Sequence, residues 1–257
     1  MSLQHGDIAG TLETVQGIPM TSVFLTARWQ HIVLANYAVD QKILQEYIPS
    51  GTELDSLEGE TYVSLVGFLF AGTRIMGVSI PFHGLFEEVN LRFYVRRKVE
   101  GEWRRGVVFI KELVPKWAVT KVARWVYHEN YATLRMGHRI EFDHTQAAQE
   151  ITYTWESRAS ACKMNADLRG ARDASSDEHA RFFADHYWGY SRRNDSKTIE
   201  YQVEHPPWEL REPVRFQLAG DLLGTYSRVF SEALSGGPQS VIVAEGSEIC
   251  VHRGSVL

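Results

Sequence analysis

Cysteine is scarce in this 257-residue sequence, and the two cysteines present cannot support a fold held by cross-links. Cys162 and Cys250 stand far apart and have no cysteine or histidine beside them at metal-ligand spacing. Disulfide-rich domains and zinc modules need several such residues at close, regular spacing. A disulfide framework and a structural zinc site are therefore excluded, and reduced thiols favour a cytoplasmic location.

The chain also lacks an excess of positive charge. Its formal net charge is −5 and its isoelectric point is near 6.1, whereas a nucleic-acid partner requires a basic surface. Two basic runs, residues 96–98 and 104–105, flank Glu100–Glu102 in a predicted hairpin tip. A solvated face is favoured there over an anion site. We therefore expect no nucleic-acid partner.

Long hydrophobic runs are missing as well. The most apolar stretch, Val63–Ala71, is too short to cross a bilayer, and no basic segment followed by an apolar run stands at the amino terminus. We expect neither a signal peptide nor a membrane partner.

The motifs that bind common cofactors are also missing. The sequence has no Walker A motif, no G-x-G-x-x-G and no G-x-S-x-G. His128-Glu129 does not begin an H-E-x-x-H motif, because position 132 is alanine. His179 and His186 are seven residues apart and lack a nearby third ligand. The sequence therefore predicts no cofactor and no metal site, and it argues against nucleotide, flavin and serine-hydrolase chemistry.

Strand-forming segments dominate what is present. Segments rich in β-branched and aromatic residues span 61–70, 89–95, 106–111, 140–142, 151–156, 198–204 and 240–251. No regular βαβ alternation is visible, so the pattern predicts a β-rich α+β fold, an antiparallel barrel or sandwich with a few flanking helices. No repeat or clear linker divides the chain. We predict a single domain over residues 1–257, with residues 1–20 flexible.

Helix signals are few. Asp40 is a plausible N-cap for a short helix that ends at Pro49, and helical spacing of apolar residues extends over 117–127. A third helix is expected after Ser175, because Ser175 and Glu178 have capping-box spacing. Residues 221–234 offer a fourth, and residues 189–191 are expected to join the third helix to the next strand.

A row of polar residues alternates with apolar ones in one predicted strand. Side chains on a strand alternate between its faces, so Asn90, Arg92 and Tyr94 share one face. That face is either the solvated exterior of a sheet or the lining of an interior. In an interior, an amide, a guanidinium and a phenol would recognise a carboxylate or carbonyl group.

A second candidate region is His205-Pro206-Pro207-Trp208, which follows a strand. The two prolines fix φ and hold the imidazole and the indole at a set angle. His205 either stiffens the turn or projects into a pocket mouth, and Trp208 is a packing lid or a stacking surface.

Several short motifs, in order, resemble one family. They are residues 87–95, residues 106–109, Ala123-Arg124 with Tyr131, and the turn at 205–208, preceded by Arg28-Trp29, Asp40, Leu44 and Ile48-Pro49. Together they resemble the YqjF-like family of uncharacterised bacterial proteins, within the acetoacetate decarboxylase-like superfamily. The resemblance covers about residues 28–208. It implies a cone-shaped β-barrel with flanking helices and a central pocket, and it favours a pocket-facing position for Asn90, Arg92 and Tyr94.

The founding enzyme of that superfamily uses adjacent lysines, one of which forms a Schiff base with its substrate. This chain has no Lys-Lys pair, and the matching segment reads His128-Glu129-Asn130-Tyr131-Ala132. We therefore predict that acetoacetate decarboxylase activity is lacking. His128, Glu129 and Tyr131 are candidate acid/base residues, although each also has an ordinary structural interpretation.

Two functions stay open. The first is a binding protein whose pocket holds a small, anionic organic molecule, contacted by Asn90, Arg92, Tyr94, His205 and Trp208. The second is an enzyme that performs lysine-independent acid/base chemistry on a small oxo-acid, by enolisation, hydration or dehydration. A protein whose pocket is filled by side chains is a third alternative, and the sequence leaves a homo-oligomer open.

Overall fold

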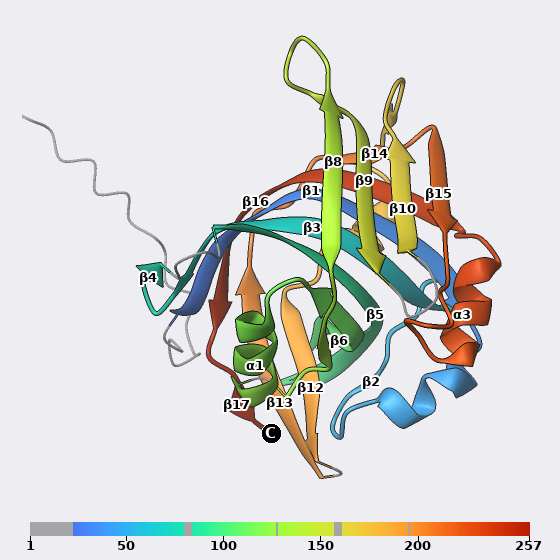
Figure 1. The fold of residues 1–257 in the computed structure, drawn as a ribbon. Coiled ribbons are helices and arrows are strands. Elements are labelled where there is room, and N and C mark those ends of the chain that lie inside the picture. The colour runs from blue at the N-terminus through green and yellow to red at the C-terminus, as the bar shows by residue number, and fades with distance from the viewer. Residues whose placement is uncertain (1–22, 80–83, 127, 157–160, 195) are drawn as a thin grey trace, which may run out of the picture.

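The computed structural model describes residues 23–79, 84–126, 128–156, 161–194 and 196–257. Residues 1–20, for which flexibility was predicted, lie outside this set. Strands dominate the structure, in two sheets (Figure 1). The main strands of the large sheet are β1 (Val23–Val39), β3 (Thr61–Ile75), β5 (Leu85–Val99), β6 (Glu102–Val114), β12 (Trp188–Asn194), β13 (Lys197–Glu204) and β16 (Ser240–His252).

These strands pair in a ring. Antiparallel ladders connect β16 to β1, β1 to β3, β3 to β5 and β5 to β6. A short parallel pairing joins β6 to β12, and β12, β13 and β16 complete the circuit. At the parallel junction Gly106 is required, because a Cβ there would lie 2.5 Å from the carbonyl oxygen of Trp188. The ring therefore encloses an inner face, as the predicted barrel requires.

Short strands extend the large sheet at its edges. They are β2 (Glu53–Leu54), β4 (Val78–Ser79), β7 (Tyr131–Thr133), β11 (Arg172–Asp173), β14 (Leu210–Glu212) and β17 (Ser255–Val256).

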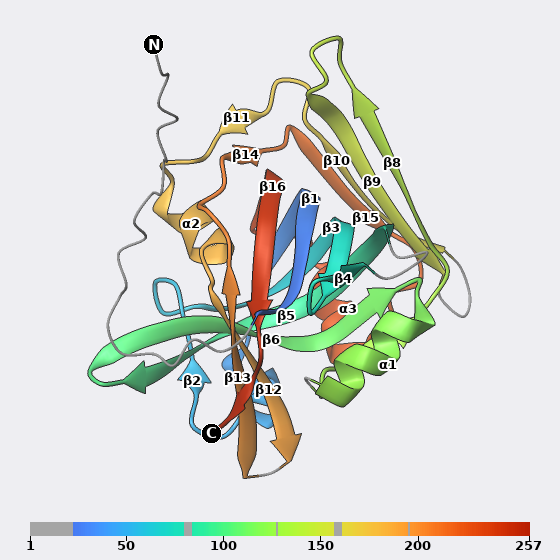
Figure 2. The same cartoon turned by 90° about the vertical axis from the view of Figure 1, so that its left-hand side faces the viewer.

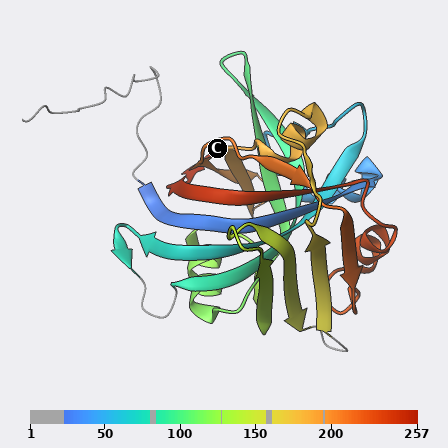
Figure 3. The ribbon, with the colours of Figure 1, turned by 90° about the horizontal axis from the view of Figure 1, so that it is seen from above.

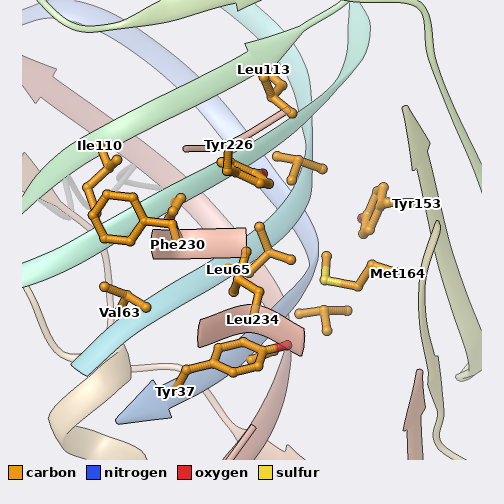
Figure 4. Packing of buried hydrophobic residues seen from close by; sticks show 14 of the residues in the cluster. Tyr37, Val63, Leu65, Ile110, Leu113, Tyr153, Met164, Tyr226, Phe230 and Leu234 are labelled. Atoms are coloured by element: carbon orange, nitrogen blue, oxygen red, sulfur yellow. The ribbon is translucent and has the colours of Figure 1, made fainter. Parts of the chain in front are cut away.

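A second sheet covers part of the outer face. It consists of β8 (Met136–Phe142), β9 (Ala148–Glu156), β10 (Ala161–Asp167) and β15 (Arg215–Ala219), and its strands run across those of the large sheet (Figures 1 and 3). Tyr153 and Met164 of this sheet lie in one buried cluster with Val63 and Leu65 of β3 (Figure 4). Gly67 permits this approach, since a Cβ there would lie 2.3 Å from the Met164 methyl group.

Strand alternation separates the outer core from the inner face. On β5, Val89, Leu91, Phe93 and Val95 are fully buried in the outer core, the cluster that they share with residues of the second sheet and α3. The intervening residues face the inside of the ring. The pairing of β5 with β6 shifts by one residue between Leu91 and Arg92. This bulge leaves the alternation of side chains along β5 unchanged. The predicted antiparallel, β-rich fold is confirmed.

The helices agree with the predictions only in part. Asp40 does cap the first segment by accepting from Lys42 N, but the segment forms two 3₁₀ turns, Gln41–Ile43 and Gln45–Tyr47. Helix α1 (Trp117–Val126) matches its prediction up to residue 126, and residue 127 lies outside the described set. Helix α3 (Arg228–Ser235) begins seven residues later than predicted, after Ser227. Figure 1 places α1 and α3 on opposite flanks of the sheets.

The predicted capping box at Ser175 was wrong. Helix α2 (Glu178–Ala184) begins after Asp177, whose carboxylate accepts from His179 N at 2.9 Å. Ser175 Oγ instead accepts from Leu210 N at 2.9 Å and so ties this segment to β14. Figure 2 shows α2 above the long curved strand β5.

The strand predictions missed several elements. Strands β1, β10 and β15 were not predicted, and residues 189–191, expected to be a connection, lie inside β12. Within the described residues, no helix is long and apolar enough to cross a bilayer.

Candidate functional site

A cavity of about 200 Å³ lies inside the ring. Inward-facing side chains of β1, β3, β5, β6, β7, β13 and β16 line it, together with two residues of α1 and the indole of Trp208. Strands from all around the ring therefore contribute to one partly open cavity. The wall combines an aromatic part with a compact polar part.

The aromatic part of the wall is continuous. The Trp29 ring lies 5.1 Å from the Phe68 ring and 6.2 Å from that of Trp208, between ring centroids. The rings of Phe70 and Phe86 stack at 5.0 Å with an interplanar angle of 13°. Contacts of this kind between aromatic rings are stabilising and hold the side chains of the wall in place. The surface is rigid and apolar.

The polar part begins on β5. Glu88, Asn90 and Arg92 alternate along the inner face, and all three line the cavity. Asn90 Nδ2 donates to Glu88 Oε1 at 2.9 Å. The Asn90 Oδ1 atom is buried and has no hydrogen-bond partner among the described residues. The amide is therefore fixed on one side and unsatisfied on the other.

Arg92 provides the cavity with a permanent cation. Its Nη2 donates to the carbonyl oxygen of Phe183 at 3.0 Å, which holds the guanidinium in place. Its Nε is buried and unpartnered within the described part of the chain, where Arg92 also forms no ion pair within 4.0 Å. A buried donor of this kind has a favourable interaction to gain from an anionic ligand.

Two further carboxyl groups enter from outside β5. Glu112 lies on β6, and Glu129 lies in the turn between α1 and β7. His128 adopts a positive φ of 56° in this turn and is exposed, whereas Glu129 is buried. The Tyr201 hydroxyl on β13 donates to Glu129 Oε1. Tyr131, at the start of β7, donates to Glu88 Oε2 at 3.2 Å.

Burial changes the ionisation of all three carboxyl groups. Desolvation raises the pKa of Glu88 to about 7, against the hydrogen bonds from Asn90 and Tyr131. It raises the pKa of Glu129 to about 8. The pKa of Glu112 is raised well above its ordinary value by burial and by repulsion from the other two carboxyl groups. At neutral pH most of this cluster is protonated, so Arg92 is the dominant charge.

The structure brings together five of the eight residues predicted for a site. Asn90, Arg92, Glu129, Tyr131 and Trp208 line the same cavity.

The other three predicted residues lie outside the lining. Tyr94 is fully buried on the inner face, and its hydroxyl shares a hydrogen bond with Ser64 Oγ. His128 is exposed. His205 stacks on Trp208 at 4.1 Å and so supports the indole from behind.

Sequence reasoning missed Glu88, Glu112 and Tyr201. Glu88 has the same strand parity as Asn90 and Arg92, so extending the alternation by one step would have found it. The Tyr201 ring fits only because residue 189 is glycine, since a Cβ there would lie 2.1 Å from the phenol ring. That pairing of glycine with tyrosine across β12 and β13 has no local sequence signal.

No lysine is among the described residues that line the cavity. Lys111 lies on β6 opposite Leu91, and its amine donates to the carbonyl oxygen of Thr225, on the outer side of the ring. Lys121 lies over the Trp117 ring on α1. No group of three His, Cys, Asp or Glu side chains within the described residues could hold a metal ion.

Comparison of the sequence with protein families finds one that covers most of the chain. The profile of the family DUF2071, described as an uncharacterized conserved protein, matches residues 26–248. The protein YqjF of Bacillus subtilis (strain 168), itself described as uncharacterized, is 35% identical over 71 residues. That match spans 27% of this chain and 29% of YqjF.

Solved structures share the fold at low sequence identity. An acetoacetate decarboxylase from Legionella pneumophila superposes with a TM-score of 0.64 at 11% identity, over 96% of this chain and 93% of the other. An acetoacetate decarboxylase-like enzyme from Sphingomonas wittichii RW1 gives 0.61 at 10% identity, over 97% and 99%. The enduracididine biosynthesis enzyme MppR, complexed with pyruvate, gives 0.60 at 12% identity, over 92% and 91%. The acetoacetate decarboxylase-like fold expected from the resemblance is confirmed.

Proposed function

We propose, for a chain that belongs to the DUF2071 family of uncharacterized conserved proteins, that its cavity binds a small organic anion. The carboxylate of this ligand pairs with Arg92, and its carbon skeleton lies against the aromatic wall. The observation that carries the proposal is the Arg92 guanidinium, which lines the cavity with its Nε unpartnered among the described residues.

The charge balance inside the cavity supports an anion. Burial raises the pKa of Glu112 well above its ordinary value and that of Glu129 to about 8, which favours the protonated, neutral form of both. Glu88, with a pKa of about 7, is only partly ionised. A buried cation without a full counter-ion attracts a carboxylate, and a planar guanidinium matches carboxylate geometry.

The pyruvate complex of MppR supports the chemical class of the ligand. Pyruvate is a small 2-oxo acid, and MppR shares the fold of this chain. The cavity offers Arg92 for a carboxylate, and Glu112, as a protonated acid with its Oε2 unpartnered in the described structure, can donate to a carbonyl oxygen. We therefore include 2-oxo acids among the ligands proposed for this chain.

Calorimetric titration of purified protein with 2-oxobutanoate tests the proposal. Arg92→Ala removes a charge-assisted hydrogen bond, so affinity should fall by about 1.5 to 3 kcal/mol. Arg96→Ala is the matched control, because Arg96 lies on the same strand but pairs with Glu53 at the surface. Equal affinity of Arg92→Ala and wild type would remove Arg92 from the site.

A second function is supported by the carboxyl cluster. Glu88 is a buried carboxyl group whose pKa of about 7 suits proton transfer at neutral pH, and Tyr131 lies in hydrogen-bond contact with it. In an enolisation, Glu88 would take a proton from the carbon beside the ligand carbonyl. The C–H electron pair becomes the enol double bond, and the carbonyl oxygen receives a proton from Glu112 or Tyr131. Glu129, hydrogen-bonded to Tyr201, remains protonated beside them.

Exchange of carbon-bound hydrogen for deuterium, followed by proton NMR of 2-oxobutanoate in D₂O, tests this second function. Glu88→Gln removes the base and should slow exchange by about 10²-fold or more. Tyr131→Phe should slow it as well, whereas Tyr94→Phe, at a buried phenol outside the cavity lining, should not. Equal exchange rates in wild type and Tyr131→Phe would exclude Tyr131 from the mechanism.

The location and the organisation of the chain complete the proposal. We propose a cytoplasmic protein that folds as a single domain. Cys162 is buried and Cys250 is half-buried, and both are free thiols. Reducing conditions keep such thiols in this state.

A further inference from the structure

The aromatic wall contains more apolar surface than pyruvate could cover. Trp29, Phe68, Phe70 and Phe86 form a continuous set of ring contacts, and Trp208 extends it. These rings all line the cavity. A three-carbon acid held at Arg92 would leave most of this wall without a partner, and apolar surface that stays uncovered contributes nothing to binding.

The polar groups of the cavity are few and mostly satisfied by one another. Asn90 and Tyr131 both donate to Glu88, and Tyr201 donates to Glu129. Among the described residues, Arg92 Nε and Glu112 Oε2 are left for the oxygens of a ligand, whereas Asn90 Oδ1 is unpartnered but can only accept a hydrogen bond. A ligand therefore finds polar partners for one carboxylate and one adjacent oxygen. Additional polar groups along its skeleton would be buried against rings without partners.

Two neutral polar atoms in the aromatic wall are consistent with a ligand that has one polar end and one apolar end. Trp29 Nε1 and Thr73 Oγ1 are buried without hydrogen bonds in the described structure. Each is a single neutral atom, and neither can neutralise a second charged group on a ligand. The cavity thus fits a molecule with one anionic end and one apolar end.

We infer that the cavity selects 2-oxo acids with an aromatic or branched apolar side chain over pyruvate. The inference rests on the proposed function, since it uses Arg92 as the anchor for the carboxylate. The apolar side chain of the ligand would pack on Phe68, Trp29 and Trp208. Phe68 lies opposite Glu88, four residues from Arg92 along β5. Binding of these acids should be tighter than that of pyruvate by roughly tenfold or more, the gain from burying one large apolar side chain.

Titration with four probes tests the inference: phenylpyruvate, 4-methyl-2-oxopentanoate, pyruvate, and phenylacetone, which keeps the ring and the carbonyl but lacks the carboxylate. Phenylpyruvate and 4-methyl-2-oxopentanoate should bind tightest, and phenylacetone should bind at least tenfold more weakly than phenylpyruvate. Arg92→Ala should remove the difference between phenylpyruvate and phenylacetone.

A wall variant separates the contribution of the rings. Phe68→Leu retains an apolar side chain but removes the ring beside Trp29, and it should weaken phenylpyruvate several-fold while leaving pyruvate unchanged. Phe142→Leu is the matched control, because Phe142 is 48% exposed on β8. A thermal unfolding curve for each variant establishes that it is folded, and Trp29→Phe provides a second wall variant should Phe68→Leu not fold.

The possible failures are distinguishable. If pyruvate binds as tightly as phenylpyruvate and both depend on Arg92, the selectivity inferred here is overturned and the proposed function stands. If phenylacetone matches phenylpyruvate, or if no acid binds, the proposed function fails, and the inference fails with it.

Discussion

Asn90 donates a hydrogen bond of 2.9 Å to Glu88 across one alternation of β5. The bond fixes the amide so that its oxygen, Oδ1, remains unpartnered among the described residues. It also stabilises the ionised form of a carboxyl group that burial would otherwise keep protonated. Two residues further along the strand, Arg92 adds a permanent charge. The inner face of β5 thus supplies the cavity with three groups: the Glu88 carboxyl group, the Asn90 amide and the Arg92 guanidinium.

Affinity for an anionic ligand should depend on pH. Glu88 has a pKa of about 7 and Glu129 of about 8, so both carboxyl groups lose protons as the pH rises from 6 to 9. The new negative charges repel a bound carboxylate, and affinity should therefore be highest at pH 6 and fall steadily above 7. Calorimetry over this range measures the effect. Glu88→Gln should flatten the lower part of the profile, and an affinity that rises with pH would contradict the account.

Replacing Glu112 by glutamine should stabilise the protein at neutral pH. In the unfolded chain this carboxyl group ionises near its ordinary pKa, whereas burial keeps it protonated in the fold. The stability of the wild type is therefore fully present below about pH 4 and declines as the pH rises toward the raised pKa. Glu112→Gln removes the part of this decline that Glu112 causes, whereas Glu88 and Glu129, whose pKa values burial also raises, cause the rest.

Urea unfolding at two pH values measures that difference. We expect the free energy of unfolding of Glu112→Gln to exceed that of wild type by at least about 1 kcal/mol at pH 8, with the two converging at pH 4. Glu102→Gln, at an exposed position on the same strand, should change stability little at either pH. A variant less stable than wild type at pH 8 would show that Glu112 is ionised in the fold.

Gly189→Ala should displace the Tyr201 side chain, which lines the cavity. A Cβ at this position would lie 2.1 Å from the Tyr201 ring, so the phenol must move away from Glu129. Overpacking of this kind lowers stability by about 1 to 3 kcal/mol. Gly84→Ala is the control, because a Cβ there has no atom within 4 Å. Equal melting temperatures for the two variants would refute the role assigned to Gly189.

Borohydride should trap no covalent adduct. Among the described residues no lysine lines the cavity, and an imine requires a primary amine near the carbonyl carbon. Mass spectrometry after treatment with borohydride and a 2-oxo acid should return the unmodified mass of the chain. A mass increase located on a lysine would show that imine chemistry has been retained.

The strands that could be predicted from the sequence are those with one apolar face and one polar face. Between Val89 and Val95 the apolar side chains lie in the outer core, and Asn90 and Arg92 on the other face line the cavity, so alternation was visible in the sequence. Strand β1 has no such contrast, because residues 32–37 are buried on both faces and form a continuous run. Without alternation, this central strand carried no strand signal that separates it from a buried helix.

The candidate site was predictable only where its residues shared one segment. Asn90 and Arg92 could be placed together by parity, and Glu129 and Tyr131 by the family resemblance. Glu88 and Glu112 are charged residues in strands, which are ordinarily solvent-facing, and only pairing of β5 with β6 inside a closed ring buries them. The aromatic wall joins β1, β3 and β5 through contacts between distant segments. No local pattern encodes those contacts. The division into a single domain stays a prediction.

A crystal structure of the protein with phenylpyruvate tests the central claim most directly, because it locates the carboxylate. We predict that a carboxylate oxygen lies within about 3 Å of Arg92 Nε, the usual distance for a charge-assisted hydrogen bond, with the phenyl ring against Phe68 and Trp29. A ligand bound elsewhere, or bound in the cavity with its carboxylate directed away from Arg92, would contradict the account.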